Sequence, residues 1–264
     1  MAFWLEKNEV AMEHTLTKLA EAIPFRRYIV ALGALWTLLV GALLWIEVSR
    51  TEQVILELAE SEAKAAFNKD IVYRQWATEK GGVYVPVTDK TPPNPYLADI
   101  PERDIVTPSG RRLTLINPAY MTRQVHELGL KEQGTHGHIT SLKPIRPENA
   151  PDLWEIQALK LFESGAKEHR SIESLDGVLN LRYMAPLPVQ EPCLQCHASQ
   201  GYQVGEVRGG ISVSIPLQPY LAVYRSRIIA TALGFGLLWM FGMAGLGLSS
   251  LSLSKHIAVY CVKQ

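Results

Sequence analysis

Two long uncharged apolar stretches divide the chain. The first covers residues 28–46 and the second residues 228–253, and neither contains Asp, Glu, Lys or Arg. A helix rises about 1.5 Å per residue, so each stretch can cross about 30 Å of hydrocarbon. The pattern therefore predicts transmembrane helices over 27–47 and 228–253. The first lies behind a polar segment and no small-residue cleavage pattern follows it, which favours an uncleaved signal anchor over a cleaved signal peptide.

Positive charge at the flanks predicts the orientation. Basic residues precede the first stretch and follow the second: Lys18, Arg26, Arg27, Lys255 and Lys263. Arg225 and Arg227 argue the opposite way, but they belong to a long loop, and long loops translocate largely regardless of charge. We therefore expect a bacterial inner-membrane protein with residues 1–26 and 254–264 in the cytoplasm and residues 48–226 in the periplasm.

The first apolar stretch predicts a helix that continues far beyond the membrane. No proline occurs between Pro24 and Pro86, and residues 51–70 keep an apolar stripe at helical spacing. Gly81-Gly82 would end this helix. Before the first stretch, residues 2–23 have helical periodicity, which fits either an amphipathic helix on the inner leaflet or a short helical tail.

The segment between the two stretches alternates strand and helix signals. Strands are predicted over 83–87, 111–116, 136–142 and 208–217, with a hairpin at Asp176-Gly177 and helices over 118–128 and 151–165. Asn149 is the expected N-cap of the second of these helices and Gly165 its stop. The pattern predicts an α+β domain: an antiparallel sheet of about five strands with helices inserted, in an order that suits a PAS-like sensor fold.

Composition narrows the function classes. Lys plus Arg equals Asp plus Glu, at 26 each, so no basic excess indicates a nucleic-acid partner. Three cysteines are too few for a disulfide scaffold. No catalytic triad, metal-hydrolase motif or phosphate-binding loop occurs, so we expect no enzymatic activity.

One motif carries specific chemistry. Residues 192–197 read Pro-Cys-Leu-Gln-Cys-His, and C-x-x-C-H is the attachment motif of c-type haem. Two thiols spaced in this way reach the two vinyl groups of a haem, and the imidazole of the adjacent histidine reaches the haem iron. We expect one covalent haem c with thioethers from Cys193 and Cys196 and with His197 as proximal iron ligand. A thioredoxin-like pair, a zinc site and a strained disulfide are the alternatives, and the sequence context favours none of them.

The second axial ligand is open at this point. Exterior candidates are Met121, His126, His136, His138, His169 and Met184. Met121 is favoured because it follows a helix start fixed by Asn117-Pro118; His126 is the alternative, and an open five-coordinate iron is the second alternative. Aromatic residues either line the ring or form core (Tyr73, Trp76, Tyr84, Tyr120, Tyr202), and Arg74, Arg123 or Arg208 would bind propionates.

Long blocks of residues 50–220 resemble a bacterial family of c-type haem sensor domains. These blocks are YRQWATEKGGVYVPVTDKTPPNPYL, LTLINPAYMTRQVHE, GHITSLKPIRPENAPDLWE and CLQCHASQGYQVGEVRGGISVSIP. The resemblance implies a PAS-like input domain of sensor histidine kinases, methyl-accepting proteins and stand-alone cytochromes. It also implies haem attachment at Cys193, Cys196 and His197. A studied type within the family uses a cysteine of the N-terminal helix as second axial ligand, and this chain has no cysteine between its first apolar stretch and Cys193.

These observations predict a membrane-anchored periplasmic sensor of redox state or of a small gas. Only SKHIAVYCVKQ follows the second apolar stretch, so we expect a partner, such as a histidine kinase or chemoreceptor, to supply the output. Homodimerisation through the helices would be compatible with Gly236, Gly242, Gly245 and Gly247. A membrane-anchored electron-transfer cytochrome and a truncated sensor kinase are the alternatives.

Overall fold

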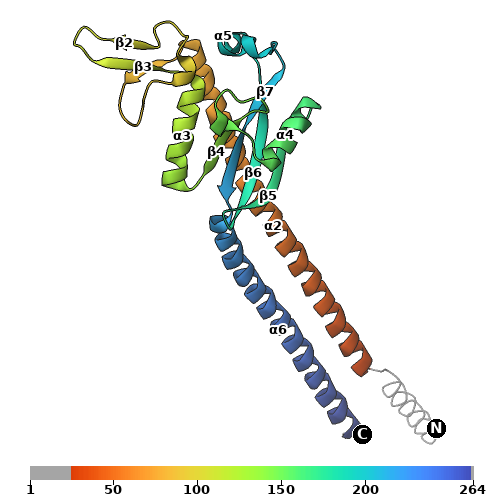
Figure 1. Cartoon of the computed structure of the whole chain (residues 1–264). Helices are drawn as coiled ribbons and strands as arrows, with labels where there is room; N and C mark the ends of the chain where they lie inside the picture. The colour runs from red at the N-terminus through yellow and green to blue at the C-terminus, as the bar shows by residue number, and fades with distance from the viewer. Residues whose placement is uncertain (1–24, 263–264) are drawn as a thin grey trace, which may run out of the picture. The chain divides into compact units, whose positions relative to one another are not determined.

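The computed structural model describes residues 25–262 and divides into two compact units (Figure 1). The larger unit covers Val54–Val223, where the sequence predicts an exterior region over 48–226. The other unit contains the described residues up to Gln53 and from Tyr224 onward. The amphipathic pattern over 2–23 lies outside the described residues.

The smaller unit consists of parts of two long helices. They are α2 (Phe25–Glu79) and α6 (Gln218–Val262), and both are long and apolar enough to cross a membrane by length and composition. Within this unit the Trp36 indole donates to the Trp239 carbonyl at 3.3 Å, and the Trp239 indole donates to Thr37 Oγ1 at 2.9 Å. The Trp36 ring lies against Gly242, where a Cβ atom would collide with it. The two helices are therefore packed closely around a pair of tryptophans.

The larger unit is α+β, as the sequence predicts, but its strands form two antiparallel sheets instead of one. The first sheet has the order β4 (His136–Thr140), β7 (Val207–Pro216), β6 (Val178–Pro188), β5 (His169–Leu175). The second has the order β1 (Val83–Pro86), β3 (Arg112–Ile116), β2 (Asp104–Val106). Strand β2 escapes sequence prediction because it is three residues long and follows a proline-rich segment.

Turn and cap chemistry fixes the local boundaries. Asp176 and Gly177 have φ values of 50° and 78°, which confirms the predicted hairpin turn between β5 and β6. Helix α3 (Pro118–Gln133) is capped by Asn117. Helix α4 (Leu153–Glu163) is capped by Asp152 through a capping box with Glu155.

The predicted cap at Asn149 is therefore wrong. Asn149 instead ends a short 3₁₀ turn, and its carbonyl accepts a hydrogen bond from the Thr140 hydroxyl at 2.8 Å.

Helices cover both faces of the four-stranded sheet. Leu181 and Tyr183 of β6 pack with Ala63 and Phe67 of α2, whereas Met184 packs with α4 through residues such as Leu159. Successive strand residues point to opposite faces, so α2 and α4 lie on opposite sides of the sheet. The face toward α2 is the one that leads to the candidate site.

A buried carboxylate links α4 to three strands. Glu155 is 1% exposed, and its oxygens lie 3.0 Å from Nδ1 of His138 on β4 and 2.5 Å from the Ser212 hydroxyl on β7. Arg182 of β6 lies 3.7 Å from Glu155 and 2.8 Å from Asp152. Burial opposes the charged form of His138, but the hydrogen bond and the charge of Glu155, aided by the Glu148 backbone and by Asp152, raise the pKa of His138.

This ion pair predicts a pH-dependent stability. The folded-state pKa of His138 lies above its ordinary value of 6.5, so the stabilisation is complete below about pH 6.5 and is lost as pH rises through the folded-state pKa. The melting temperature of the full chain in detergent should therefore fall between pH 6 and 8, as measured by circular dichroism, and His138→Gln should flatten that slope. His136→Gln, on the same strand, is the control; an undiminished slope in His138→Gln would contradict the assignment.

Candidate functional site

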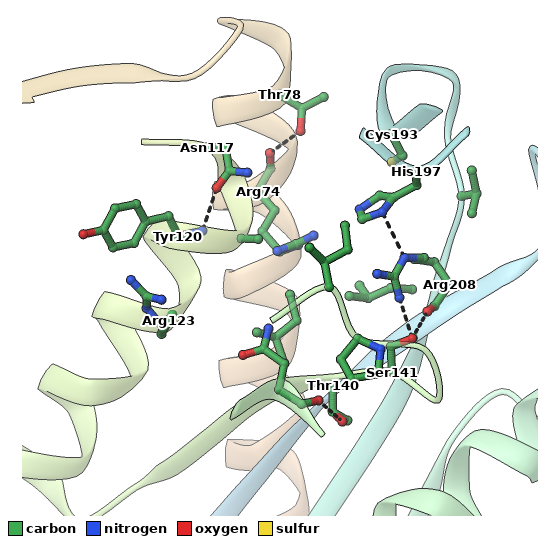
Figure 2. A pocket seen from close by; sticks show the side chains of 18 of the residues that line it. Arg74, Thr78, Asn117, Tyr120, Arg123, Thr140, Ser141, Cys193, His197 and Arg208 are labelled. Carbon is green, nitrogen blue, oxygen red and sulfur yellow. Dashed lines mark hydrogen bonds between the residues drawn. The ribbon is translucent and has the colours of Figure 1, made fainter. Parts of the chain in front are cut away.

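A cavity of about 430 Å³ lies within the larger unit (Figure 2). Its walls come from α2, α3, β4, the end of β6, the start of β7 and the Cys-Leu-Gln-Cys-His motif. On α2 the lining residues are Phe67, Asn68, Ile71, Arg74, Gln75 and Thr78. Their spacing of one, three and four residues places them on one helical face. The volume is within the range of about 300–1,000 Å³ that is usual for cofactor pockets.

The cysteine motif forms consecutive helical turns at the cavity edge. They are η3 (Glu191–Cys193), α5 (Leu194–His197) and η4 (Ala198–Gln200). Cys193 is half-buried, and its side chain and that of His197 line the cavity. Cys196 lies in α5, one residue before His197. The motif therefore presents a thiol and an imidazole to the same space.

The imidazole of His197 is held through Nδ1. Gln200 Oε1 lies 2.8 Å from this nitrogen, and Arg208 Nε lies 3.2 Å from it. Burial lowers the pKa of His197; the Gln200 hydrogen bond opposes this effect, and the charges of Arg208 and Arg74 add to it. A lowered pKa favours the neutral form of the ring, which is the form that binds metals.

Four arginines line the cavity: Arg74, Arg123, Arg146 and Arg208. No Asp or Glu accompanies them among the described lining residues. Figure 2 shows Arg74 of α2 on one side, with Cys193, His197 and Arg208 on the other. The charged side chains on the wall are therefore all positive.

Two of these arginines have acidic partners outside the wall, and two contact only neutral groups. Arg146 Nε lies 3.3 Å from Glu148 Oε2, and Arg123 Nε lies 3.7 Å from Glu127 Oε1. Arg74 donates to the Pro118 carbonyl and to Thr122 Oγ1, both at 3.3 Å. Burial lowers the pKa of Arg74, partly offset by Cys193 and Asp70. Arg123 stacks on the Tyr120 ring at 4.3 Å, and its Nε is buried without a hydrogen-bond partner among the described residues. The arginines without an acidic partner favour an anionic occupant, because an unpaired buried charge is costly.

Arg208 lies at the start of β7, where several contacts hold its side chain. Its Nη1 donates to Ser141 Oγ in a short hydrogen bond, and its guanidinium lies 5.0 Å from the centre of the Tyr202 ring. Burial lowers its pKa, an effect opposed by Tyr202. Ser141 Oγ in turn donates to the Arg208 carbonyl at 2.7 Å. These contacts fix the guanidinium beside His197.

The structure does not bring the predicted second ligands to the cavity. Helix α3 presents Ala119, Tyr120 and Arg123 to it, so Met121 lies on a different helical face. His126 is turned toward α2, where its Nε2 lies 2.6 Å from Asp70 Oδ2. As the sequence predicts, both residues lie on one helix, α3, and this helix lines the cavity. The rotation of α3 about its own axis decides which of its side chains reach the cavity.

The other candidates are also engaged elsewhere. His138 contacts Glu155, His169 lies 5.1 Å from the Trp154 ring, and Met184 is fully buried against α4. His136 lines a second, smaller cavity of about 180 Å³ together with His126 and His138. Within the described cavity wall, His197 is the only histidine, and no methionine or lysine occurs.

The predicted surroundings are partly found at the cavity. Arg74, Arg123, Arg208 and Tyr120 line it, whereas Tyr73, Trp76, Tyr84 and Tyr202 are not among the lining residues. Sequence reasoning missed Arg146, Gln200 and Ser141. Only Gln200 had a local signal, because it follows His197 by three residues and so lies one helical turn away.

Comparisons with known proteins identify one family and one solved structure that this chain is similar to. The model of the Tll0287-like family matches residues 51–216. A solved structure described as that of the cyanobacterial heme-protein Tll0287 aligns with 17% sequence identity and a TM-score of 0.37, covering 59% of this chain and 93% of that chain. No curated protein matches. Because the family model covers well over half of the chain, including the cysteine motif, the chain belongs to the Tll0287-like family.

Proposed function

We propose that this protein is a membrane-anchored c-type haem sensor with its haem domain in the periplasm. The observation that carries the proposal is a C-x-x-C-H motif on the wall of a cavity that has four arginines and no described acidic residue. Family membership supports haem binding. The proposed fold of the larger unit is PAS-like, supported by an antiparallel sheet with its cavity on the side of α2.

The residues at the cavity fit haem c. A porphyrin is apolar across its ring and carries two carboxylates. The cavity combines apolar residues such as Phe67, Ile71 and Leu187 with Arg74 and Arg208, which donate only to neutral groups. Cys193 and Cys196 would form the thioethers, and His197 would bind the iron. When bound, the haem would supply a redox-active iron with one axial position for an exchangeable ligand.

The described wall offers no second strong ligand to a haem iron. Apart from His197, its lining residues include no histidine, methionine or lysine. The side chains that remain, such as Ile71, Ile139 and Asn68, are apolar or weak ligands. An open position would suit a small-gas sensor, whereas an electron-transfer cytochrome generally keeps two strong protein ligands.

The proposed signal leaves the haem through α2. Phe67, Ile71 and Arg74 line the cavity, and the same helix includes the first apolar stretch. A change in charge or ligation at the iron would alter the forces on these side chains and bias the helix between two states. The protein would act without enzymatic activity of its own and would signal to a histidine kinase or chemoreceptor partner, or within a homodimer.

Covalent attachment provides the first test. In the full-length protein, haem should remain with the polypeptide on a denaturing gel, as detected by its peroxidase activity. Cys193→Ser combined with Cys196→Ser should abolish this signal, because no thioether can form. Cys261→Ser, at the only other cysteine, is the matched control and should retain it. Haem that extracts into acidic organic solvent from the wild type would refute covalent attachment.

Ligand binding tests the sensor assignment. The reduced wild-type protein should have the absorption spectrum of a five-coordinate high-spin haem and should bind carbon monoxide without displacing a protein ligand. Met121→Ala and His126→Ala should leave both spectra unchanged, because neither side chain lines the cavity. A low-spin six-coordinate spectrum in both oxidation states, with no carbon monoxide binding, would favour electron transfer instead.

Reporter fusions test the topology. Alkaline phosphatase fused at Gly165 should be active, because the enzyme requires export to the periplasm, whereas the same fusion at Gln264 should be inactive. The prediction rests on the two apolar helices and the positive charge at their cytoplasmic flanks. The reverse pattern of activities would exclude a periplasmic haem domain.

A further inference from the structure

The Nδ1 atom of His197 has two neighbours that cannot both be its hydrogen-bond partners. Gln200 Oε1, at 2.8 Å, can only accept a hydrogen bond, whereas Arg208 Nε, at 3.2 Å, can only donate one. A protonated Nδ1 satisfies the first contact and an unprotonated Nδ1 the second. The choice determines which ring nitrogen keeps a lone pair for a metal.

The orientation of Gln200 resolves this choice. Its Nε2 donates to the Lys143 carbonyl at 3.2 Å. A carbonyl oxygen only accepts, so the amide nitrogen must face Lys143 and the amide oxygen must face His197. Reversing the amide would place two oxygens against each other. Nδ1 of His197 therefore carries the proton, and Nε2 holds the free lone pair.

Arg208 does not need the imidazole as an acceptor. Its Nη1 already donates to Ser141 Oγ, and its guanidinium is stacked on Tyr202. Donation from Arg208 into Nδ1 would also leave the proton of the neutral ring on Nε2, where it would block coordination. The hydrogen bond from Arg208 Nε therefore belongs to the tautomer that cannot bind a metal through Nε2, and the shorter Gln200 contact belongs to the tautomer that can.

We propose that Gln200 is the positioning residue of the haem site, fixing the tautomer of His197 and tuning its donor strength toward iron. This inference rests on the proposed function, because it takes His197 as the proximal ligand. Gln200 ends η4, one turn after His197, and Lys143 belongs to the segment that supplies Pro144, Ile145 and Arg146 to the cavity wall. Gln200 therefore ties the cysteine motif to this neighbouring segment of the wall while it holds the ring. Such partners orient metal-bound histidines and adjust their basicity.

Two substitutions with opposite expected effects test the proposal. Gln200→Glu places a stronger acceptor on Nδ1–H, increases electron donation from the ring and should lower the reduction potential below that of the wild type. Gln200→Leu removes the acceptor and should raise the potential. The iron–histidine stretching frequency of the reduced protein should rise in the first variant and fall in the second, as measured by resonance Raman spectroscopy.

Controls separate this role from packing and from the haem assignment itself. Gln203→Leu, at an exposed position nearby, should leave the potential and the frequency unchanged. Shifts in the same direction for both Gln200 variants, or no shift in Gln200→Glu, would overturn the proposal. Gln200→Glu is decisive by itself if Gln200→Leu does not incorporate haem. Wild-type protein without covalent haem would instead refute the proposed function, whereas normal haem with unchanged potentials would refute only the role of Gln200.

Discussion

The pairing of β7 between β4 and β6 is the interaction on which the candidate site depends. β7 joins β4 along His136–Thr140 and β6 along most of its length, so it fixes both neighbours. Its first residues include Arg208 and Gly209, which line the cavity, and its later residues include Ser212, which donates to buried Glu155. Gly209 lies so close to the Thr140 carbonyl that no larger residue would fit without movement. Any displacement of β7 would therefore affect the cavity and the buried charge cluster together.

The second constraint is charge. Of the four arginines on the cavity wall, Arg74 and Arg208 have no acidic hydrogen-bond partner, and a guanidinium that loses hydration without such a partner is electrostatically unfavourable. Hydrogen bonds to neutral oxygens, such as those from Arg74 to Pro118 and Thr122, compensate this loss only in part. We infer that the native site is most stable when a carboxylate-bearing group fills it, as propionates would. Loading of the cofactor and stability of the domain would then be linked.

The two charged clusters of the larger unit are organised differently. Around Glu155 the charges are mutually paired, since His138 and Arg182 approach the same carboxylate from two strands. Around the cavity, Arg123 and Arg146 lie near single carboxylates outside the wall, whereas Arg74 and Arg208 donate only to neutral groups. This contrast distinguishes a cluster that holds helix and sheet together from one arranged for a ligand, and it separates the stability of the fold from the chemistry of the site.

Local sequence determined the elements and the cofactor motif. Gly81-Gly82, Asn117-Pro118 and Asp176-Gly177 set their boundaries through backbone chemistry within a few residues, and the spacing of Cys193, Cys196 and His197 indicates haem c without tertiary information. The predicted cap of α4 at Asn149 is wrong because Asp152, three residues later, forms the capping box with Glu155.

Only the tertiary structure decided what surrounds the motif. The rotation of α3 turns Met121 away from the cavity and Arg123 toward it, and that rotation depends on packing against segments distant in sequence. The strands divide into two sheets because of long-range pairing, which the alternation of residues does not encode. Arg146 and Lys143 reach the site on a loop whose position follows from β4 pairing with β7. Short-range rules therefore determine which residues can carry the chemistry, whereas long-range packing determines which of them meet.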